Sequence, residues 1–250
     1  VFTMKKPNNQ FIVCKGINSA ISILSSGRYD VNHVDILKGG RAFKDDSIKP
    51  FFRSFNFNIL EKEHFYKKHP GDRSQGIVIT FQGSIISNDI PEFNDQEDVC
   101  LLALDQIEDP QNFGQIIRTA ECAGINGIIF PKHHSAPITQ TVLQVSQGAF
   151  VNIPLYEVTN LNHEVLKLKK SGFWTIGLEN SINAKPWYEV ELIGKTVIIV
   201  GSEGRGLREK VFESCDFIAT IPMQGKTNSL NVSAAVSAIA FERLRQVQKG

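Results

Sequence analysis

The sequence predicts an α/β protein in which a parallel sheet covered by helices follows a smaller α/β unit. After residue 98, short apolar runs alternate with longer helical patterns, which is typical of a parallel sheet with helices on both faces. Residues 84–98 are polar and acidic and contain Pro91, so they predict a linker between the two units. The chain of 250 residues is long enough for both.

Composition indicates an ordinary globular protein, with 42% hydrophobic and 21% charged residues. No apolar run approaches the roughly 20 residues of a membrane span, and the first ten residues lack the apolar core of a signal peptide. The four cysteines are scattered and form no CxxC pair, so we expect neither a metal site nor a disulfide framework. These observations predict a cytoplasmic protein with reduced cysteines.

Charge is distributed unevenly although the net charge is only +1. Residues 1–90 hold 13 Lys and Arg against 8 Asp and Glu, whereas residues 91–250 hold 14 against 18. This asymmetry is compatible with a front unit that binds nucleic acid, and equally with ordinary scatter of charge.

Each element of the front unit follows from its local pattern. Residues 17–26 carry apolar side chains at helical spacing, and residues 33–39 and 76–81 read as strands. Between them, residues 44–60 predict a helix broken near Pro50 and followed by a strand. The phenylalanines at 51, 52, 55 and 57 are expected mostly in the core.

After residue 98, strand-like and helix-like patterns alternate more regularly than in the front unit. Gly124 and Gly172 are expected to end two of its helices, because glycine readily adopts the left-handed conformation that closes a helix. Trp174 and Trp187 are expected in the core rather than stacked on bases. The predicted strands are residues 99–104, 127–130, 173–178, 196–200 and 217–222, and the predicted helices are residues 112–124, 139–149, 161–172 and 229–246.

The turn "VGSEGRGL", residues 200–207, follows a run of β-branched residues and predicts backbone amides converging on a ligand. It is not a P-loop, because Leu207 and Arg208 stand where Lys and Ser or Thr are required. It is also a poor match to the GxGxxG motif of dinucleotide-binding proteins, because Glu209 stands where that motif has its third glycine. Its carboxylate, Glu203, is also unsuited to a phosphate site.

Two more polar loops occur in the same part of the chain. In "DPQNFGQIIRTAECAG", Asn112 is a candidate helix N-cap and Arg118 lies further along the helix. In "IPMQGKTNSLNVSAAVSAIAFERLR", Ser229, Leu230 and Asn231 open the last helix. Each loop alone is compatible with capping and turn chemistry. Three polar strand ends in one α/β unit together predict a site.

These three segments resemble, in order and spacing, the three motifs of the SpoU (TrmH) RNA 2′-O-ribose methyltransferases, over residues 99–250. In the front unit, "GINSAISIL", "HVDILKG" and "SQGIVI" resemble the small substrate-binding domain, similar to ribosomal protein L30e, of the branch that methylates guanosine in bacterial 23S rRNA. The stretch "PKHHSAPITQTVLQVSQGAF" is similar to the same branch.

The resemblance implies an L30e-like RNA-binding domain (residues 1–83), a linker (84–98) and a SPOUT-type methyltransferase domain (99–250) whose C-terminal chain forms a trefoil knot. It further implies a homodimer that uses S-adenosyl-L-methionine. The implied cofactor-binding residues are Thr175, Gly177, Leu178, Gly201, Glu203, Gly206, Ile221, Met223, Ser229 and Leu230. The implied catalytic residues are Asn112, Arg118, Glu203, Ser229 and Asn231.

The implied reaction is S-adenosylmethionine-dependent 2′-O-methylation of a ribose, that of guanosine, in 23S rRNA. Arg118 would orient the ribose-phosphate or stabilise the developing oxyanion, since arginine stays protonated and is a poor base. Glu203 would either tie down its loop or face the sulfonium of the cofactor. Candidate RNA contacts are Lys38, Arg41, Arg73, Arg205 and Arg208. The alternatives are a tRNA ribose methyltransferase of the same family and an inactive relative that binds RNA.

Overall fold

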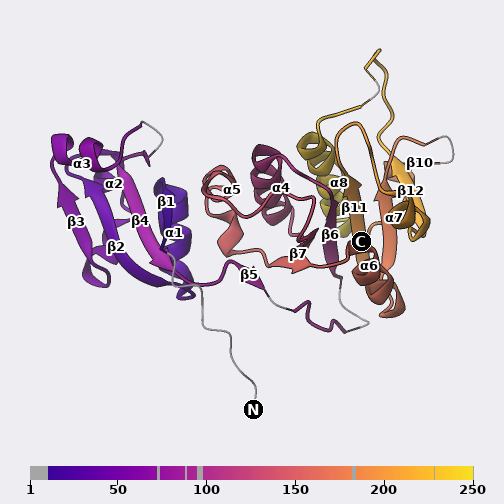
Figure 1. The fold of residues 1–250 in the computed structure, drawn as a ribbon, viewed down its shortest axis with the longest axis horizontal. Coiled ribbons are helices and arrows are strands. Elements are labelled where there is room, and N and C mark those ends of the chain that lie inside the picture. The colour runs from indigo at the N-terminus through magenta and orange to yellow at the C-terminus, as the bar shows by residue number, and fades with distance from the viewer. Residues whose placement is uncertain are drawn as a thin grey trace. The chain divides into compact units, whose positions relative to one another are not determined.

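The structure, a computed structural model, describes residues 11–71, 74–87, 89–94, 98–181, 184–227 and 229–249 (Figure 1). The chain forms two compact units, one of Val1–Ile85 with Leu143–Asn152 and the other of Ile86–Val142 with Ile153–Gly250. The first unit thus includes a segment from the part of the chain that we assigned to the second domain. None of the described helices is both long and apolar enough to span a membrane.

The first unit is built on a four-stranded sheet with the order β1-β4-β2-β3, in which only β2 and β3 are parallel. Helix α1 ends at Gly27, whose φ of +62° is in the left-handed region. The elements are β1 (Ile12–Lys15), α1 (Ile17–Ser26), β2 (Asp30–Leu37), α2 (Arg41–Lys44), the 3₁₀ turn η1 (Lys49–Arg53), β3 (Phe57–Leu60), α3 (Lys62–Lys68) and β4 (Ile77–Gln82).

The helix that we predicted from residue 44 is wrong. Helix α2 ends at Lys44, and the side chain of Asp45 then accepts hydrogen bonds from the backbone and hydroxyl groups of Ser47, which form a turn. Pro50 is the second residue of a 3₁₀ turn that starts at Lys49, and it does not interrupt an α-helix. Aspartate and serine favour such turns because their side chains satisfy nearby backbone donors.

Segment Leu143–Asn152 belongs to the first unit through contacts with its first helix and strand. The Gln144 side chain donates to the Lys15 carbonyl over 3.1 Å, and the Arg28 guanidinium donates to the Val151 carbonyl over 2.6 Å. These contacts join residues more than 120 positions apart in the sequence.

The second unit contains, within the described residues, a parallel sheet, as predicted, but with eight strands instead of the five expected. The strand of this sheet that comes first in the sequence, β5, lies in the stretch that we expected to be a linker. The strands are β5 (Ile86–Ser87), β6 (Cys100–Asp105), β7 (Gly127–Pro131), β8 (Leu155–Val158), β9 (Trp174–Leu178), β10 (Lys185–Pro186), β11 (Thr196–Gly201) and β12 (Phe217–Thr220). Their order is β10-β12-β9-β11-β6-β7-β8-β5.

The helices that follow these strands begin and end at expected residue types. At their N-termini, Asp109 caps α4, which has Pro110 in its first turn, and Asn160 caps α6. After their C-termini come Gly124 and Gly172, whose φ angles of +72° and +86° are in the left-handed region. The helices after β6 are α4 (Pro110–Cys122), α5 (Gln140–Ser146), α6 (Leu161–Lys170), α7 (Glu209–Glu213) and α8 (Val232–Val247), with 3₁₀ turns η3 (Ala149–Val151) and η4 (Trp187–Glu189). Of these, η3 and the end of α5 belong to the first unit.

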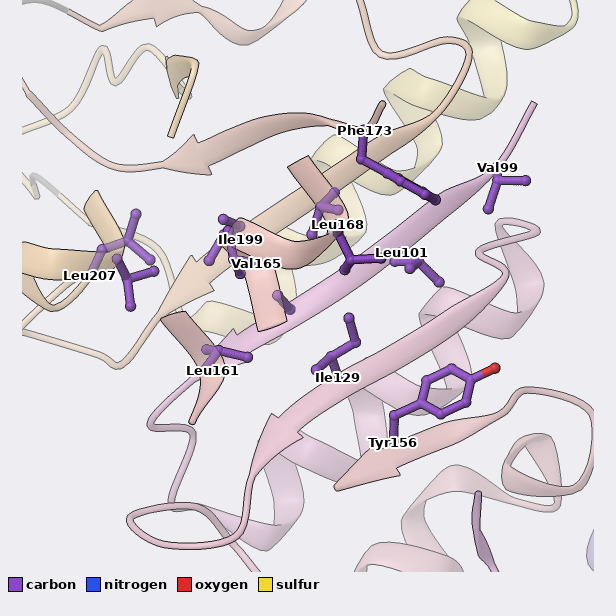
Figure 2. Close-up of a cluster of buried hydrophobic side chains, with 13 residues drawn as sticks. Val99, Leu101, Ile129, Tyr156, Leu161, Val165, Leu168, Phe173, Ile199 and Leu207 are labelled. Carbon is purple, nitrogen blue, oxygen red and sulfur yellow. The ribbon is translucent and has the colours of Figure 1, made fainter. Parts of the chain in front are cut away.

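One face of this sheet is buried under α6 (Figure 2). Leu161, Val165 and Leu168, on successive turns of α6, belong to the same buried cluster as Leu101 of β6 and Ile199 of β11. Alternate residues of the same strands, such as Leu102 and Ile198, are also fully buried. Both faces of the central strands are therefore covered, which explains why their sequences are continuously apolar.

The order of the strands reverses direction between β6 and β11. From β6 the chain runs outward through β7 and β8, then crosses to β9, and β11 returns to lie between β9 and β6. Asp105, Leu178 and Gly201 end three adjacent strands at the carboxyl edge, with Gly201 paired to Asp105. In open parallel sheets, ligands bind at the carboxyl edge beside such a reversal.

The predicted burial of Trp174 is wrong. Its side chain, at the first position of β9, is 58% exposed, while Trp187 in η4 is half-buried. The four phenylalanines of the first unit at positions 51, 52, 55 and 57 are also only half-buried, and they pack on one another or on Phe43.

Candidate active site

The glycine-rich turn after β11 folds back on itself. The Gly206 N–H donates to the Ser202 carbonyl over 3.0 Å, and these two residues form an isolated antiparallel bridge. Gly204 and Gly206 have φ of +78° and +67°, which glycine adopts without a steric penalty. A Cβ on Gly201 would lie 2.1 Å from the carbonyl carbon of Gly206. Backbone geometry alone therefore requires these glycines.

Two carboxylates, at the ends of the strands on either side of β11, bind the last residues of this turn. Asp105, whose side chain is fully buried, accepts the Arg208 backbone N–H at 2.8 Å and its guanidinium at 2.7 Å. Glu179, directly after β9, accepts the Leu207 N–H at 2.8 Å. Arg208, which we predicted to contact RNA, thus has its guanidinium bound to Asp105, although 44% of its side chain remains exposed.

Glu203, in the middle of the turn, connects three segments of the chain. Its Oε1 accepts the side-chain amide of Asn231 at 2.6 Å, that of Asn112 at 3.1 Å and the Val232 N–H at 3.3 Å. Asn231 Nδ2 also lies 3.0 Å from Asn112 Oδ1. The structure therefore brings together three of the five predicted catalytic residues, and the contacts of Glu203 favour the loop-tying role.

Asn231 also caps α8, because its side chain accepts the Ser233 N–H at 2.9 Å. The Ser233 hydroxyl lies 2.8 Å from Gln115 Oε1 and 2.6 Å from Asn231 Oδ1, and it can donate to one of them at a time. The proposed capping role of Asn112 is wrong, since Asp109 caps α4 and Asn112 lies inside the helix. Its amide is free for Glu203 for this reason.

The turn lies between two cavities. One, of about 350 Å³, is lined by most of the predicted cofactor residues and by Glu179. The other, of about 230 Å³, is lined by the start of α4 and the loop before it, including Asp109 and Asn112. Ser202, Glu203, Arg205 and Val232 line both. The predicted residues in the larger cavity are Leu178, Gly201, Glu203, Gly206, Ile221, Met223, Ser229 and Leu230.

The chemistry of the larger cavity suits a ligand with a cationic centre. Its lining includes the carboxylates of Glu179 and Glu203, whereas Arg205 is the one cation among the described lining residues. The Ser202 hydroxyl is buried and has no hydrogen-bond partner among the described residues. A polyphosphate would be repelled by the carboxylates, while a sulfonium would be attracted. The residues present therefore fit S-adenosylmethionine.

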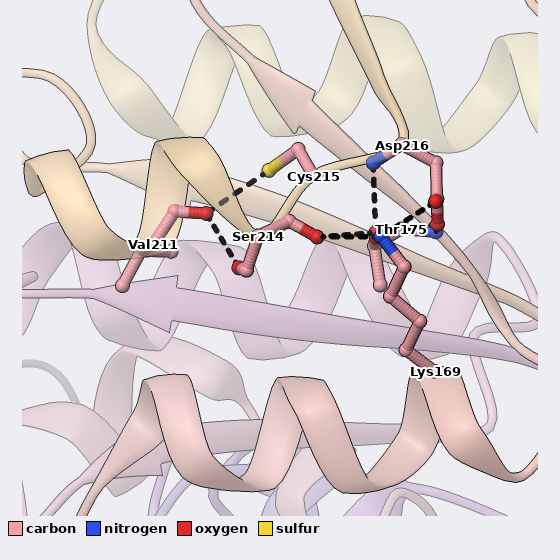
Figure 3. Close-up of polar contacts among 6 residues, drawn as sticks. All are labelled: Lys169, Thr175, Val211, Ser214, Cys215 and Asp216. Carbon is pink, nitrogen blue, oxygen red and sulfur yellow. Dashed lines mark hydrogen bonds and ion pairs between the residues drawn. The ribbon is translucent and has the colours of Figure 1, made fainter.

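Thr175 is not among the described residues that line this cavity. Figure 3 shows it instead in a group of polar contacts with Ser214 and Asp216. It is fully buried near the amino end of β9, where its hydroxyl is 3.0 Å from the Ser214 carbonyl and 2.8 Å from Asp216 Oδ2. Lys169 Nζ binds Asp216 Oδ1 at 2.6 Å. Burial opposes ionisation of Asp216, but the hydrogen bonds from Lys169 and Thr175 outweigh it and lower the pKa of Asp216. Thr175 thus joins β9 to the loop after α7.

Gly177 also lies outside the cavity lining, in the centre of β9. A Cβ there would approach the Cys215 sulfur at 2.9 Å, the Leu207 side chain at 2.9 Å and the Ile218 side chain at 3.0 Å. The glycine is therefore explained by close side-chain packing on the sheet.

Arg118 is exposed and makes no hydrogen bond to Glu203, Asn112 or Asn231. It follows Asn112 by six residues, or roughly 9 Å along the helix axis. Six residues also rotate the side chain by about 240°, so Arg118 and Asn112 leave α4 in different directions. Ser229 is likewise exposed and lines the cofactor cavity without a hydrogen bond to those three residues.

Of the other predicted RNA contacts, Lys38, Arg41 and Arg205 are described and exposed. In the first unit, Lys38 pairs with Glu61 at 2.5 Å, and Arg41 begins α2. Arg73 lies outside the described residues. Arg205, at the tip of the glycine turn, is exposed beside both cavities.

Sequence reasoning missed Asp105, Glu179, Gln115 and Ser202 as contributors to the site. A signal existed for the first two, since each carboxylate ends an apolar strand at the edge where the other motifs meet. Gln115 follows Asn112 by three residues and so shares its face of the helix.

Comparison with known proteins matches residues 100–241 to the SpoU rRNA Methylase family. RlmB of Pseudomonas aeruginosa, a 23S rRNA (guanosine-2′-O-)-methyltransferase, is 45% identical over 146 residues, which are 58% of this chain and 58% of RlmB. The A. aeolicus TrmH/SpoU tRNA modifying enzyme is 27% identical, with a TM-score of 0.57 over 62% of this chain and 78% of that one.

The SpoU methyltransferase AviRb from Streptomyces viridochromogenes, solved in complex with AdoMet, is similar over 96% of this chain and 92% of its own, with a TM-score of 0.78 and 19% identity. At that identity the likeness shows the fold alone. The family match, in contrast, covers more than half of the chain and includes all three polar loops. The chain therefore belongs to the SpoU rRNA methylase family.

Proposed function

We propose that this chain transfers the methyl group of S-adenosylmethionine to the 2′-hydroxyl of a ribose in RNA. The observation that carries the proposal is the position of the glycine turn between two cavities, with Glu203 and Asn112 at their boundary. A methyl transfer needs a donor and an acceptor on either side of one point, and this geometry supplies two spaces that meet.

The larger cavity would hold the methyl donor. Bound there, the donor supplies a methyl group activated by its sulfonium. Gly201, Ile221 and Leu230 line the cavity and would bind it largely through backbone groups. Glu179 would place negative charge near the cationic centre, Glu203 would hold the turn that forms the cavity wall, and the buried Ser202 hydroxyl offers an unused hydrogen bond.

The smaller cavity, beside the start of α4, would receive the ribose. Its walls include Asn112 and Arg205, an amide and a cation that can orient a sugar and its phosphate. Arg118 would stabilise the negative charge that develops on the attacking oxygen, while Ser229 lines the donor cavity and Asn231 holds Glu203. Since Arg118 is solvent-exposed, we place it in direct contact with the RNA rather than in the donor cavity.

We propose ribosomal RNA as the substrate and guanosine of 23S rRNA as the modified nucleoside. The 45% identity to the RlmB of Pseudomonas aeruginosa supports this choice. The likeness to the A. aeolicus tRNA modifying enzyme supports tRNA as a second candidate. With either substrate we propose a cytoplasmic enzyme.

We further propose the remaining features that the family resemblance implies. These are a trefoil knot formed by the chain after β11, a homodimer, and an L30e-like first domain (residues 1–83) joined by residues 84–98 to the methyltransferase domain (99–250). Lys38, Arg41 and Arg73 would carry RNA contacts of the first domain, and Arg205 those near the reaction. Light scattering measures the oligomeric state directly.

The test of the function uses tritiated S-adenosylmethionine with 23S rRNA fragments and with tRNA transcripts, followed by mapping of the methylated nucleotide. Label on a ribose of either RNA supports the activity, and the mapped position decides the substrate. Cofactor binding without label on any RNA would leave the inactive, RNA-binding alternative.

Arg118→Ala tests the assignment of the acceptor site. We expect methyl transfer to be abolished while the affinity for S-adenosylmethionine, measured by calorimetry, stays within several-fold. Arg245→Ala is the matched control, because Arg245 is an exposed arginine on α8 paired only with Glu242 among the described residues. Turnover near that of the wild type in Arg118→Ala would remove Arg118 from the mechanism.

A further inference from the structure

A cavity of about 750 Å³ lies at the opposite edge of the large sheet from the proposed active site. It is formed where β9 and β12 begin, since Trp174 and Phe217 are the first residues of these strands. Lys185, whose backbone pairs with Ala219 further along β12, also lines the cavity. It is larger than the cofactor cavity of about 350 Å³. Nothing in the proposed reaction uses it.

Its most unusual feature is an exposed aromatic pair. Trp174 is 58% exposed and Phe217 is 36% exposed, and their ring centroids are 5.6 Å apart with an interplanar angle of 47°. Ile193, which also lines the cavity, is 39% exposed. Elsewhere in the unit, rings such as Phe113 and Phe130 pack together in the fully buried core. A cluster of exposed apolar side chains around one hollow marks a binding surface.

Charged groups line the same cavity. Lys185 Nζ lies 5.9 Å from the centre of the Phe217 ring, and the exposed residues Glu189 and Glu191 line the cavity wall. An aromatic platform, a cation and hydrogen-bond acceptors are the three groups that bind an unpaired nucleotide, through its base, its phosphate and its amino groups respectively. An acidic peptide would instead meet the carboxylates of Glu189 and Glu191, which offset the two lysines of the lining, Lys185 and Lys195.

We propose that this cavity binds an unpaired purine nucleotide of the RNA substrate, with the base against Trp174 and Phe217 and the phosphate beside Lys185. Purines stack over a larger area than pyrimidines. Adenine and guanine also carry amino groups that can donate hydrogen bonds to Glu189 or Glu191, whereas uracil has no amino group. The inference rests on the proposed function, because it takes RNA as the partner.

The distance to the reaction is compatible with one RNA reaching both places. Strand β9 begins at Trp174 in this cavity and ends at Leu178 in the cofactor cavity. Four residue steps of a strand span roughly 13 Å. A single strand of a few nucleotides covers that length, so the aromatic cavity would hold a nucleotide close in sequence to the methylated one.

The test measures the binding of fluorescein-labelled oligoribonucleotides AGAGA and UUUUU to the full chain by anisotropy. We expect tighter binding of AGAGA, and a loss of roughly 5- to 150-fold in its affinity for Trp174→Ala and for Phe217→Ala. Lys185→Ala should reduce the dependence of binding on salt by about one ion. Tyr188→Ala is the matched control, since Tyr188 is a neighbouring aromatic that is 55% exposed and outside the described cavity lining.

A second readout does not depend on loss of a side chain. The chain has two tryptophans, so Trp187→Phe leaves Trp174 as the only tryptophan fluorophore. Stacking of a base should quench its emission on titration with AGAGA. No quenching, together with equal affinities of Trp174→Ala and Tyr188→Ala for AGAGA, would overturn the inference.

The outcome is separable from that of the proposed function. Methyl transfer by the wild type with no effect of Trp174→Ala on RNA binding removes only the aromatic site. Quenching by AGAGA without methyl transfer to any RNA retains the site and refutes the reaction. Unchanged affinity for S-adenosylmethionine confirms that each variant is folded.

Discussion

Replacing Arg208 by alanine should destabilise the second unit, because it leaves a buried carboxylate without its cation. Asp105 has a fully buried side chain and binds both the backbone N–H and the guanidinium of Arg208. In Arg208→Ala the backbone hydrogen bond can remain, but the ionised Asp105 loses its charged partner. The glycine turn that ends at Arg208 loses an anchor at the same time.

The magnitude follows from the exposure of the two partners. Removing one member of a fully buried ion pair costs about 3–5 kcal/mol. Arg208 is 44% exposed, so water can reach the carboxylate once the guanidinium is gone, and the retained N–H still binds it. We therefore expect a loss of about 2–3 kcal/mol, or roughly 4–12 °C in the melting temperature of a chain of this size.

Scanning calorimetry and urea unfolding measure this loss. Arg205→Ala is the control, because Arg205 lies in the same turn, is exposed and makes no hydrogen bond in the described part of the chain; its stability should change by less than about 0.5 kcal/mol. Asp105→Asn should be less harmful in the Arg208→Ala background than in the wild type, since it removes the unpaired charge. A loss below about 1 kcal/mol for Arg208→Ala, or additive effects of the two changes, would refute the reasoning.

Three further changes have definite expected outcomes. Gly201→Ala should abolish S-adenosylmethionine binding in calorimetry, because its Cβ would overlap the backbone of Gly206 at 2.1 Å; unchanged affinity would contradict the turn geometry. Glu203→Gln keeps an oxygen acceptor and should retain most cofactor affinity, whereas Glu203→Ala should not; a collapse in the glutamine variant would instead indicate a charge role. Burial alone would raise the pKa of Asp35, but hydrogen bonds from Lys68 and neighbouring side chains outweigh burial and lower this pKa in the folded protein. Ionised Asp35 therefore stabilises the fold at pH values above its unfolded pKa of about 4. This stabilisation is lost as the pH falls through the pKa of Asp35 in the folded protein. Urea unfolding between about pH 7 and about pH 3 should therefore show a steeper loss in the wild type than in Asp35→Asn, and parallel curves would argue against it.

Features with a local cause were predictable from the sequence. Gly124 and Gly172 end α4 and α6 as expected, because a left-handed residue after a helix is a property of a few neighbouring residues. The apolar runs that form β6 and β11 were recognisable for the same reason. The predicted helix after residue 44 failed where two local signals competed, since the turn at Asp45 and Ser47 replaced helical hydrogen bonds.

Features that depend on contacts between distant residues were not predictable. Asp105 and Arg208 are 103 positions apart, and no local pattern links them. Thr175 sits one position after the exposed Trp174, and alternation along the strand gives one of them a buried polar network and the other a solvent-facing ring. The contacts of both come from a distant part of the chain, since Asp216 binds Thr175 and Phe217 packs on Trp174 some 40 residues later in the sequence.

The two glycines Gly177 and Gly201 show why residue type alone could not define the cofactor site. They lie on adjacent strands, and both leave no room for a Cβ. At Gly177 the obstructing atoms are side chains on the face of the sheet, whereas at Gly201 they are the backbone of the turn beside the cavity. Side chains can shift to admit a methyl group, but a closed backbone turn cannot without opening. The same glycine signal thus reports packing in β9 and site geometry at the end of β11, and only the fold distinguishes them.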